Sequence, residues 1–200
     1  SGDRWLGQAA LISACTLLSR VLGLVRDVLM AAYFGTGAAM DAFVLAFMVP
    51  NLFRRLFGEG AMSAAFIPVL TDYSKRDDPA EGERFFRAAF TSMLVFLGSI
   101  SVVAWLVCEV LPQRLALNDT WRLFFPLLQV VFPYMPLICL TVMASAALNV
   151  RGHFLLPALA PVMLNVCWTA GMLFGASRYG ISAVAVAVLA GGAAQLAMVV

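Results

Sequence analysis

The stretch AAFTSMLVFLGSISVVAWLVC, residues 88–108, contains no charged side chain. A helix needs about 20 apolar residues to cross the hydrocarbon core of a bilayer. Three further uncharged runs follow it, at residues 123–150, 154–177 and 179–200. Continuous runs of this length are typical of spanning helices, and they lack the alternating segments of about ten residues that a membrane barrel would show. The chain is therefore predicted to be an all-α, polytopic transmembrane bundle.

The composition of the whole chain also indicates a membrane protein. Of its 200 residues, 62% are hydrophobic and 12% are charged, whereas soluble domains have about 45–50% and about 25%. The 13 Lys and Arg against 11 Asp and Glu are too few and too balanced for a nucleic-acid partner. The four cysteines lie far apart in apolar runs and are interpreted as small hydrophobic residues. His153 follows a short polar break and is expected to be solvated.

The two N-terminal segments differ from the later ones because they carry charges inside apolar sequence. We expect residues 1–4 to be a tag or N-terminal flank and residues 5–200 to form one six-helix transmembrane lobe. The last run reaches residue 200 without a polar end, which suggests a piece of a longer membrane protein. The expected helices cover residues 5–34, 38–72, 79–111, 119–150, 154–177 and 179–200.

Basic residues at the two ends of these helices predict the orientation. With the N-terminus in the cytoplasm, six Lys and Arg lie on the inner side and three lie on the outer side, which the positive-inside rule favours. The inner residues are Arg4, Lys75, Arg76, Arg84, Arg87 and Arg151, and the outer ones are Arg114, Arg122 and Arg178.

Four arginines lie within the first two predicted helices, at positions 20, 26, 54 and 55. Each would cost about 2.5–3.5 kcal/mol at the bilayer centre, so four facing lipid would cost on the order of 10 kcal/mol. They are therefore expected to face a polar cavity, and Arg20, with apolar residues on both sides, cannot easily reach either surface.

Three acids in the same segments, Asp27, Asp41 and Glu59, are candidate partners for these four arginines. Arg55 and Glu59 have the i, i+4 spacing of a helical ion pair, so pairing and cavity roles are about equally plausible for Arg55. One positive charge remains unmatched. Since the planar guanidinium can donate two parallel hydrogen bonds to phosphate oxygens, the cavity is expected to bind a phosphate-bearing lipid or solute.

Other polar and helix-breaking residues carry weaker signals. Gln129, Asn165 and Gln195 are expected either to hydrogen-bond between helices or to line a cavity, the former being more common. The prolines within residues 119–150 and 154–177 suggest bends, since each removes a backbone hydrogen bond.

Several motifs resemble the MurJ (MviN) family of bacterial lipid II flippases. They begin with SRVLGLVRD at residues 19–27 and FGTG at residues 34–37, and continue with PNLFRRLFGEG at residues 50–60. The resemblance extends to the end of the chain through Asp41-Ala42-Phe43, Ala64, Phe66, Pro68, Phe132-Pro133-Tyr134, Pro157-Ala158-Leu159-Ala160-Pro161 and Leu164-Asn165.

The resemblance implies a fold and an activity. The family belongs to the multidrug/oligosaccharidyl-lipid/polysaccharide exporter superfamily. Its members have fourteen helices, arranged as two lobes of six helices and two additional helices. This chain would be the N-terminal lobe. The protein would be a transporter of the bacterial cytoplasmic (inner) membrane and not an enzyme. It would move the undecaprenyl-diphosphate-linked peptidoglycan precursor, lipid II, to the outer leaflet by alternating access.

The resemblance also implies roles for particular residues. Arg20, Arg26 and Arg54 would bind the diphosphate, whereas Asp27, Asp41, Arg55 and Glu59 would form gate or cavity ion pairs. No cofactor is implied. A coupling ion such as sodium, or the membrane potential, would act outside this chain, and the partners would be lipid II, membrane lipids and the C-terminal lobe.

Three other functions remain open. A related exporter could move another polyprenyl-linked glycan or drugs, although cationic drugs would call for unmatched acids. An intramembrane enzyme acting on polyprenyl diphosphates would need a positioned acid, base or metal cluster, and the acids here are dispersed. A non-transporting cell-wall scaffold would have no reason to keep four arginines at membrane depth.

Overall fold

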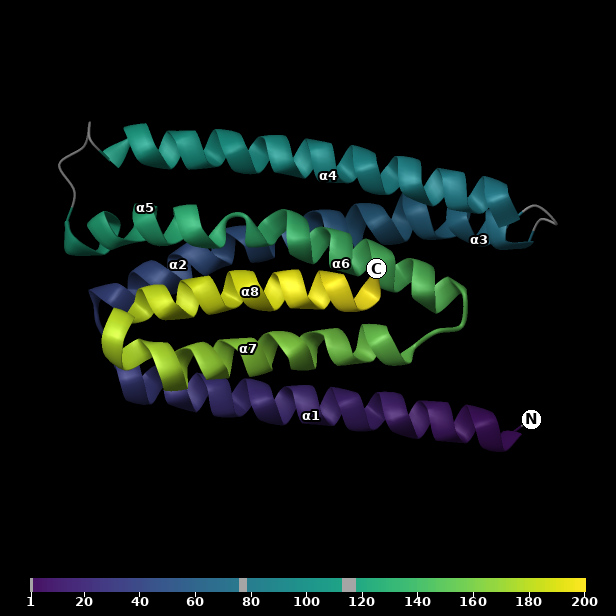
Figure 1. Cartoon of the computed structure of the whole chain (residues 1–200), viewed down its shortest axis with the longest axis horizontal. Coiled ribbons are helices and arrows are strands. Elements are labelled where there is room, and N and C mark those ends of the chain that lie inside the picture. The colour runs from purple at the N-terminus through teal and green to yellow at the C-terminus, as the bar shows by residue number, and fades with distance from the viewer. Residues whose placement is uncertain (1, 76–78, 113–117) are drawn as a thin grey trace.

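The computed structural model describes residues 2–75, 79–112 and 118–200, and its regular elements are all helical. This confirms the predicted all-α class. The elements in chain order are α1 (Gly2–Phe34), α2 (Ala38–Phe53), the π-helix η1 (Arg54–Phe66), α3 (Ile67–Lys75), α4 (Pro79–Val110), α5 (Asp119–Val131), α6 (Tyr134–Val150), α7 (Leu155–Tyr179) and α8 (Ile181–Val199) (Figure 1).

The segment expected as one helix over residues 38–72 is divided into α2, η1 and α3. The change from α- to π-helical hydrogen bonding begins at Arg54 and ends at Phe66. This stretch contains Gly58 and Gly60, which weaken the α-helical preference, and π-turns are rare elsewhere and frequent at functional sites. Arg54 and Arg55 therefore lie where the helix changes from α- to π-helical geometry.

The segment expected over residues 119–150 is also broken. α5 ends at Val131, α6 begins at Tyr134, and the two helices meet at an angle of 40°. Pro133 lies in the break, as expected of a residue that cannot donate a backbone hydrogen bond. Of the two other prolines in this segment, Pro126 lies inside α5 without ending it.

The prediction of six spanning helices is too high for the described residues. Four helices are long and apolar enough to cross a membrane, and the bent pair α5–α6 would make a fifth span. The segment after α1 does not count as a span because it is divided into α2, η1 and α3, which have 16, 13 and 9 residues and are each shorter than the 18 residues that a span requires. The four single spans are Ala9–Phe34, Ala80–Val110, Leu155–Tyr179 and Ile181–Val199.

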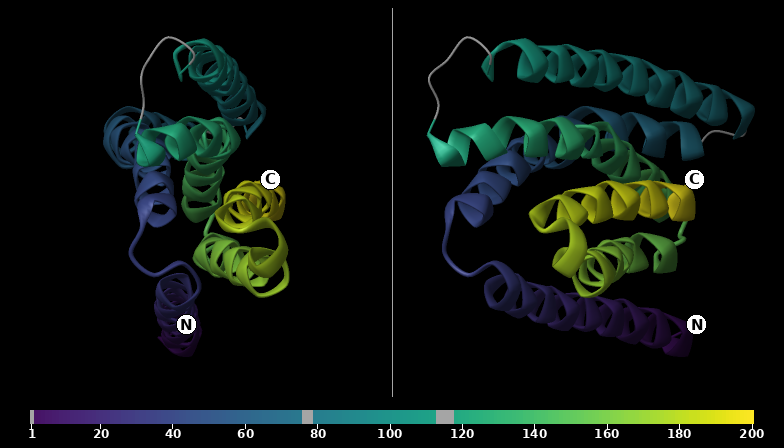
Figure 2. Two further views of the ribbon diagram at one scale, coloured as in Figure 1. Left: turned by 90° about the vertical axis from the view of Figure 1, so that its left-hand side faces the viewer. Right: turned by 60° about the vertical axis from the view of Figure 1, so that its left-hand side comes forward.

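The helices lie side by side along one axis, with α1 on one outer edge and α4 on the other (Figures 1 and 2). α1 packs on α7, and α4 packs on α3, α5 and α6. The central core lies between α2, α5, α6 and α8 and includes Phe43, Val131, Met135 and Val188, each at most 2% exposed. The hydrophobic surfaces of both edge helices remain largely exposed, as suits contact with lipid.

α7 and α8 pack so closely that two positions between them accept only glycine. A Cβ atom on Gly171 would overlap that of Ala187, and one on Gly175 would lie 2.8 Å from the Cβ of Ala183. Small residues allow two membrane helices to approach in this way. The tight pair supports the side chains that α7 presents toward α1.

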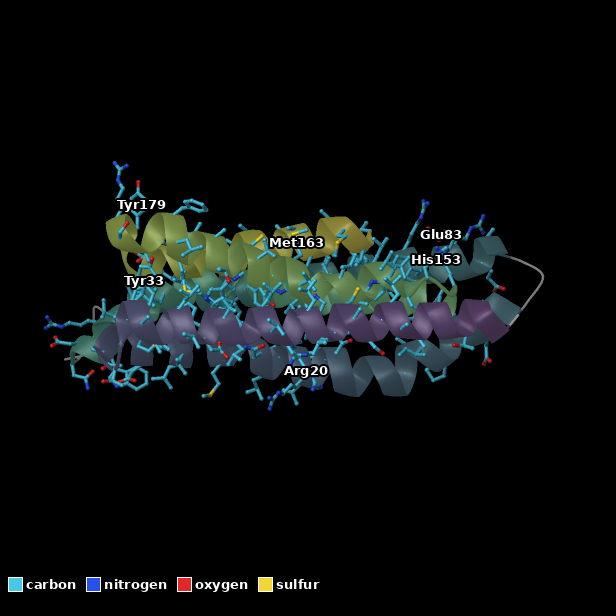
Figure 3. All side chains as sticks on the ribbon, turned by 90° about the horizontal axis from the view of Figure 1, so that it is seen from below. Arg20, Tyr33, Glu83, His153, Met163 and Tyr179 are labelled. Atoms are coloured by element: carbon cyan, nitrogen blue, oxygen red, sulfur yellow. The ribbon has the colours of Figure 1, made fainter. Side chains whose placement is uncertain are left out.

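The two ends of the bundle carry different residues. Tyr33 and Tyr179 lie near one end, Glu83 and His153 lie near the other, and Arg20 lies between them, far from both (Figure 3). At the His153 end, Arg151 donates a hydrogen bond of 2.8 Å to Glu83, joining the end of α6 to the start of α4.

Candidate functional site

A hollow of about 740 Å³ lies between α1, α2 and α7. α1 contributes Arg26, Asp27 and Met30, and α7 contributes Trp168. α2 and the first turn of η1 supply the opposite wall, which consists of Met40, Phe43, Val44, Phe47, Met48, Asn51, Leu52, Arg54 and Arg55. We call this the upper hollow.

Arg26 in the upper hollow contacts three neighbouring side chains. Its Nε and Nη2 donate to Oδ1 of Asp27 at 3.0 and 2.8 Å, and its Nη1 donates to Oδ1 of Asn165 at 2.9 Å. The guanidinium carbon also lies 4.5 Å from the centre of the Trp168 ring, a cation–π geometry. Three of its five N–H donors are thus engaged, which leaves two for a ligand.

Asn165 connects this arginine to the backbone of α1. The side chain is 6% exposed, and its Nδ2 donates to the carbonyl oxygen of Ser19 at 3.0 Å. Both ends of one buried amide therefore bind α1, at Ser19 and at Arg26. The expectation of a hydrogen bond between helices holds for Asn165, Gln129 and Gln195 alike.

A second hollow of about 620 Å³, the middle hollow, shares Arg54 with the upper one. Its walls come from α3, α6, α7 and α8. The remaining lining residues are Ile67, Ile138, Thr141, Val142, Ser145, Ala146, Asn149, Val150, Pro157, Ala160, Pro161 and Gln195. Arg54 is half-buried at the boundary between the two hollows and lines both of them.

Arg20 lines a third hollow of about 430 Å³, the lower hollow, between α1 and the beginning of α7. This hollow shares Asn149, Pro157 and Pro161 with the middle one. Arg20 is exposed, and among the described residues no acid forms an ion pair with it. It lies near the middle of the bundle's long axis, away from both ends (Figure 3).

Of the predicted acidic partners, the structure describes the side chains of Asp27 and Asp41, and both are exposed. Asp27 pairs with its neighbour Arg26 and is 65% exposed. Asp41 is exposed in the first turn of α2, where a negative charge suits the helix N-terminus. Arg55 is exposed at the upper hollow, and the side chain of Glu59 lies outside the described part of the structure.

Sequence reasoning did not identify Trp168 as part of the site. Its ring contacts Arg26 on one side and makes edge contacts with Phe43 and Phe47, at centroid distances of 5.5 and 4.9 Å. The available signal was the i, i+3 spacing of Asn165 and Trp168, which places both on one face of α7. The described residues include no cluster of three or more His, Cys, Asp or Glu side chains that could hold a metal ion.

Comparison with known proteins gives a consistent result. The family model described as "Lipid II flippase MurJ" matches residues 30–200. The chain is 38% identical over 191 residues to the lipid II flippase MurJ of Burkholderia cenocepacia, a match that covers 92% of this chain and 37% of that protein. It is 38% identical over 199 residues to the probable lipid II flippase MurJ of Treponema pallidum, covering 95% of this chain and 37% of that protein.

A solved structure has the same arrangement of helices. It is a lipid II flippase MurJ in an inward closed conformation, with a TM-score of 0.79 and 29% sequence identity. The match covers 94% of this chain and 40% of that one. The chain thus spans less than two fifths of the length of the curated relatives described above.

Proposed function

This chain belongs to the MurJ family of lipid II flippases, and from that premise we propose that it is the N-terminal lobe of a transporter that moves lipid II from the inner to the outer leaflet. The lobe supplies one wall of a cationic cavity, and a C-terminal lobe supplies the other. The substrate is the undecaprenyl-diphosphate-linked peptidoglycan precursor. The transporter lies in the bacterial cytoplasmic membrane, with the N-terminus of this chain in the cytoplasm.

The observation that carries the proposal is that three adjoining hollows are each lined by an arginine. Arg26 lines the upper hollow, Arg54 lines both the upper and the middle hollow, and Arg20 lines the lower one. The upper and middle hollows share Arg54, and the middle and lower hollows share Asn149, Pro157 and Pro161, so the three hollows adjoin one another. An anionic head group that passes from one hollow to the next meets an arginine in each.

The chemistry of the three arginines suits a diphosphate. Guanidinium groups bind phosphate oxygens through pairs of parallel hydrogen bonds, and a desolvated site strengthens such contacts. Arg20 and Arg54 bind the diphosphate from two sides, and Arg26 adds its two remaining N–H donors. The lobes then rock about the bound head group, which requires that the two states bind it differently or that an ion gradient biases them.

The acidic residues and Arg55 have a supporting role in this scheme. Asp27 holds Arg26 in place through Oδ1. We assign Asp41, Arg55 and Glu59 to ion pairs that form and break at the cavity and its gate as the lobes move. The coupling force, a sodium gradient or the membrane potential, acts through parts of the transporter that this chain does not contain.

The orientation agrees with the distribution of charge. The start of α4, which carries Arg84 and Arg87, lies at the same end of the bundle as the connection from α6 to α7, which contains Arg151 and His153 (Figure 1). The start of α5, which carries Arg122, and the end of α7, which carries Arg178, lie at the opposite end. We assign the His153 end to the cytoplasm, because cytoplasmic ends of membrane proteins carry the excess of Lys and Arg. The middle and lower hollows then lie on the cytoplasmic side of the upper one.

The test is flipping of lipid II by the full-length transporter in sealed vesicles. Arg20→Gln and Arg54→Gln should each lower the flipping rate by about tenfold or more, since losing a charge-assisted hydrogen bond costs about 1.5–3 kcal/mol. Arg178→Gln is the matched control, because Arg178 is exposed at the other end of α7 and its guanidinium contacts Tyr179. Normal flipping by both cavity variants would defeat the proposal.

A further inference from the structure

The upper and middle hollows differ in chemistry although they share Arg54. The upper hollow combines three arginines and Asp27 with aromatic and Met side chains. In the middle hollow, Arg54 is the one charged residue among the described lining, and the other polar groups are the neutral Thr141, Ser145, Asn149 and Gln195. The middle hollow is therefore suited to an uncharged, hydrogen-bonding group attached to an anion held at Arg54.

Among these polar residues, Gln195 on α8 has a buried side-chain atom without a hydrogen-bond partner among the described residues. It is 2% exposed, and its Nε2 donates to the carbonyl oxygen of Ala160 at 2.8 Å. That bond fixes which end of the amide is which, because a carbonyl accepts only from the NH₂ group. The other end, Oε1, is buried and accepts no hydrogen bond from the described residues.

Some of the buried polar atoms without a hydrogen-bond partner belong to residues that line the hollows. Four buried side-chain N or O atoms lack a partner within the described chain, those of Ser101, Trp168, Thr169 and Gln195. Two of them belong to residues lining the hollows on either side of Arg54: the indole N–H of Trp168 and the amide oxygen of Gln195. By contrast, Thr141 in the same middle hollow is satisfied by the carbonyl oxygen of Leu137 at 2.8 Å.

A buried acceptor without a donor lowers stability, so its presence in a binding wall indicates a donor from a ligand. If Arg54 holds the diphosphate, the next chemical group along the head group lies in the middle hollow. Sugar hydroxyls and acetamido N–H groups are neutral hydrogen-bond donors and match an amide oxygen. We infer that Gln195 is a specificity residue that accepts a hydrogen bond from the neutral sugar next to the diphosphate.

This assignment rests on the proposed function and adds to it a preference for sugar-bearing substrates. Oε1 is enclosed in this conformation, so the sugar reaches it only after neighbouring side chains of the hollow have moved. The bond to Ala160 keeps the amide of Gln195 oriented, with Oε1 left over to accept. Selection at Gln195 therefore depends on the sugar and is independent of the phosphates.

The experiment measures binding of two probes to the full-length transporter in nanodiscs: undecaprenyl diphosphate, and the same lipid diphosphate carrying its sugars. For the unmodified protein, the sugar-bearing probe should bind about tenfold more tightly than the sugar-free one. This is the change in affinity that one additional hydrogen bond produces. Gln195→Met keeps the length and burial of the side chain but removes its acceptor. It should remove that preference and leave the affinity for the sugar-free probe unchanged.

A matched variant separates this role from packing. Gln129→Met makes the same change at another hydrogen bond between helices, the 3.0 Å contact with Glu109 outside the three hollows, and should keep the preference. Arg54→Gln should weaken both probes equally.

The outcomes are distinguishable. Equal binding of the two probes by the unmodified protein would overturn the inference even if Gln195→Met did not fold, and so would a Gln195→Met protein that kept the preference. If neither probe bound the unmodified protein, the proposed function itself would fail.

Discussion

Asn165 accepts a 2.9 Å hydrogen bond from Arg26 across the contact between α7 and α1. The same amide donates to the backbone of Ser19, seven residues earlier and therefore about two turns away on α1. α1 is the edge helix that packs chiefly on α7. A single buried side chain thus holds both a cavity arginine and the helix that carries it.

Replacing Asn165 by Leu should loosen α1. The change leaves Arg26 without one acceptor and adds bulk beside Ser19, so we expect the free energy of unfolding to fall by about 1–3 kcal/mol. Thermal unfolding of the detergent-solubilised full-length protein would measure this. Ser19→Ala keeps the carbonyl oxygen that Asn165 binds and should change the midpoint little. A Leu variant as stable as the unmodified protein would show that the amide does not hold α1.

Two substitutions of Trp168 should differ in their effect on stability, because one removes the aromatic ring and the other keeps one. Trp168→Ala leaves a void beside Phe43 and Phe47 and should cost about 3–5 kcal/mol of stability. Trp168→Phe keeps an aromatic ring under Arg26 but gives a weaker cation–π contact, so its cost should be smaller. Chemical denaturation of both variants would test the order. Equal costs would mean that the ring does not support Arg26.

Glycine substitutions should have opposite effects on two helices. Gly171→Ala drives a methyl group into Ala187 and should destabilise the α7–α8 pair by about 1–3 kcal/mol, as overpacking does. Gly98→Ala on α4 meets nothing within 4 Å and should be stabilising by up to about 1 kcal/mol through helix propensity. Thermal midpoints of the two variants would be compared, and a stabilising Gly171→Ala would contradict the tight packing.

Cysteine labelling should establish the orientation. His153 and Tyr179 are exposed at opposite ends of the bundle (Figure 3), whereas the native Cys15, Cys108 and Cys139 are buried. A membrane-impermeant maleimide added to intact cells should label Tyr179→Cys and not His153→Cys, because the more basic end is cytoplasmic. Inverted vesicles should give the reverse pattern. Labelling of His153→Cys from outside would refute the proposed orientation.

The spanning helices could be predicted because hydrophobicity is a local property of the sequence. The uncharged run at residues 88–108 lies within α4, and the runs at residues 154–177 and 179–200 coincide with α7 and α8 to within two residues at each end. The π-helical stretch after Phe53 could not be predicted in this way, because apolar patterning does not distinguish a widened helical turn from an α-helical one. Pro133 did mark a real break, whereas Pro126 looked the same in sequence and lies inside α5.

The arginines of the site could be located from sequence because a charge at membrane depth is costly wherever it faces lipid. Their surroundings could not. Arg26 and Asn165 are 139 residues apart, and only the packing of α1 on α7 brings them together. For the same reason, Trp168 looked like an ordinary apolar residue of a spanning run.

The π-helix from Arg54 to Phe66 has a consequence for sequence change in this region. Each of its turns closes from residue i to i+5 and so contains one residue more than an α-helical turn. When a single residue within η1 is deleted, one π-turn can therefore become an α-helical turn, and the direction of α3 stays the same. The same deletion within α7 would swing every later side chain by about 100°. Insertions and deletions between homologous chains should therefore be more frequent in η1 than in α7.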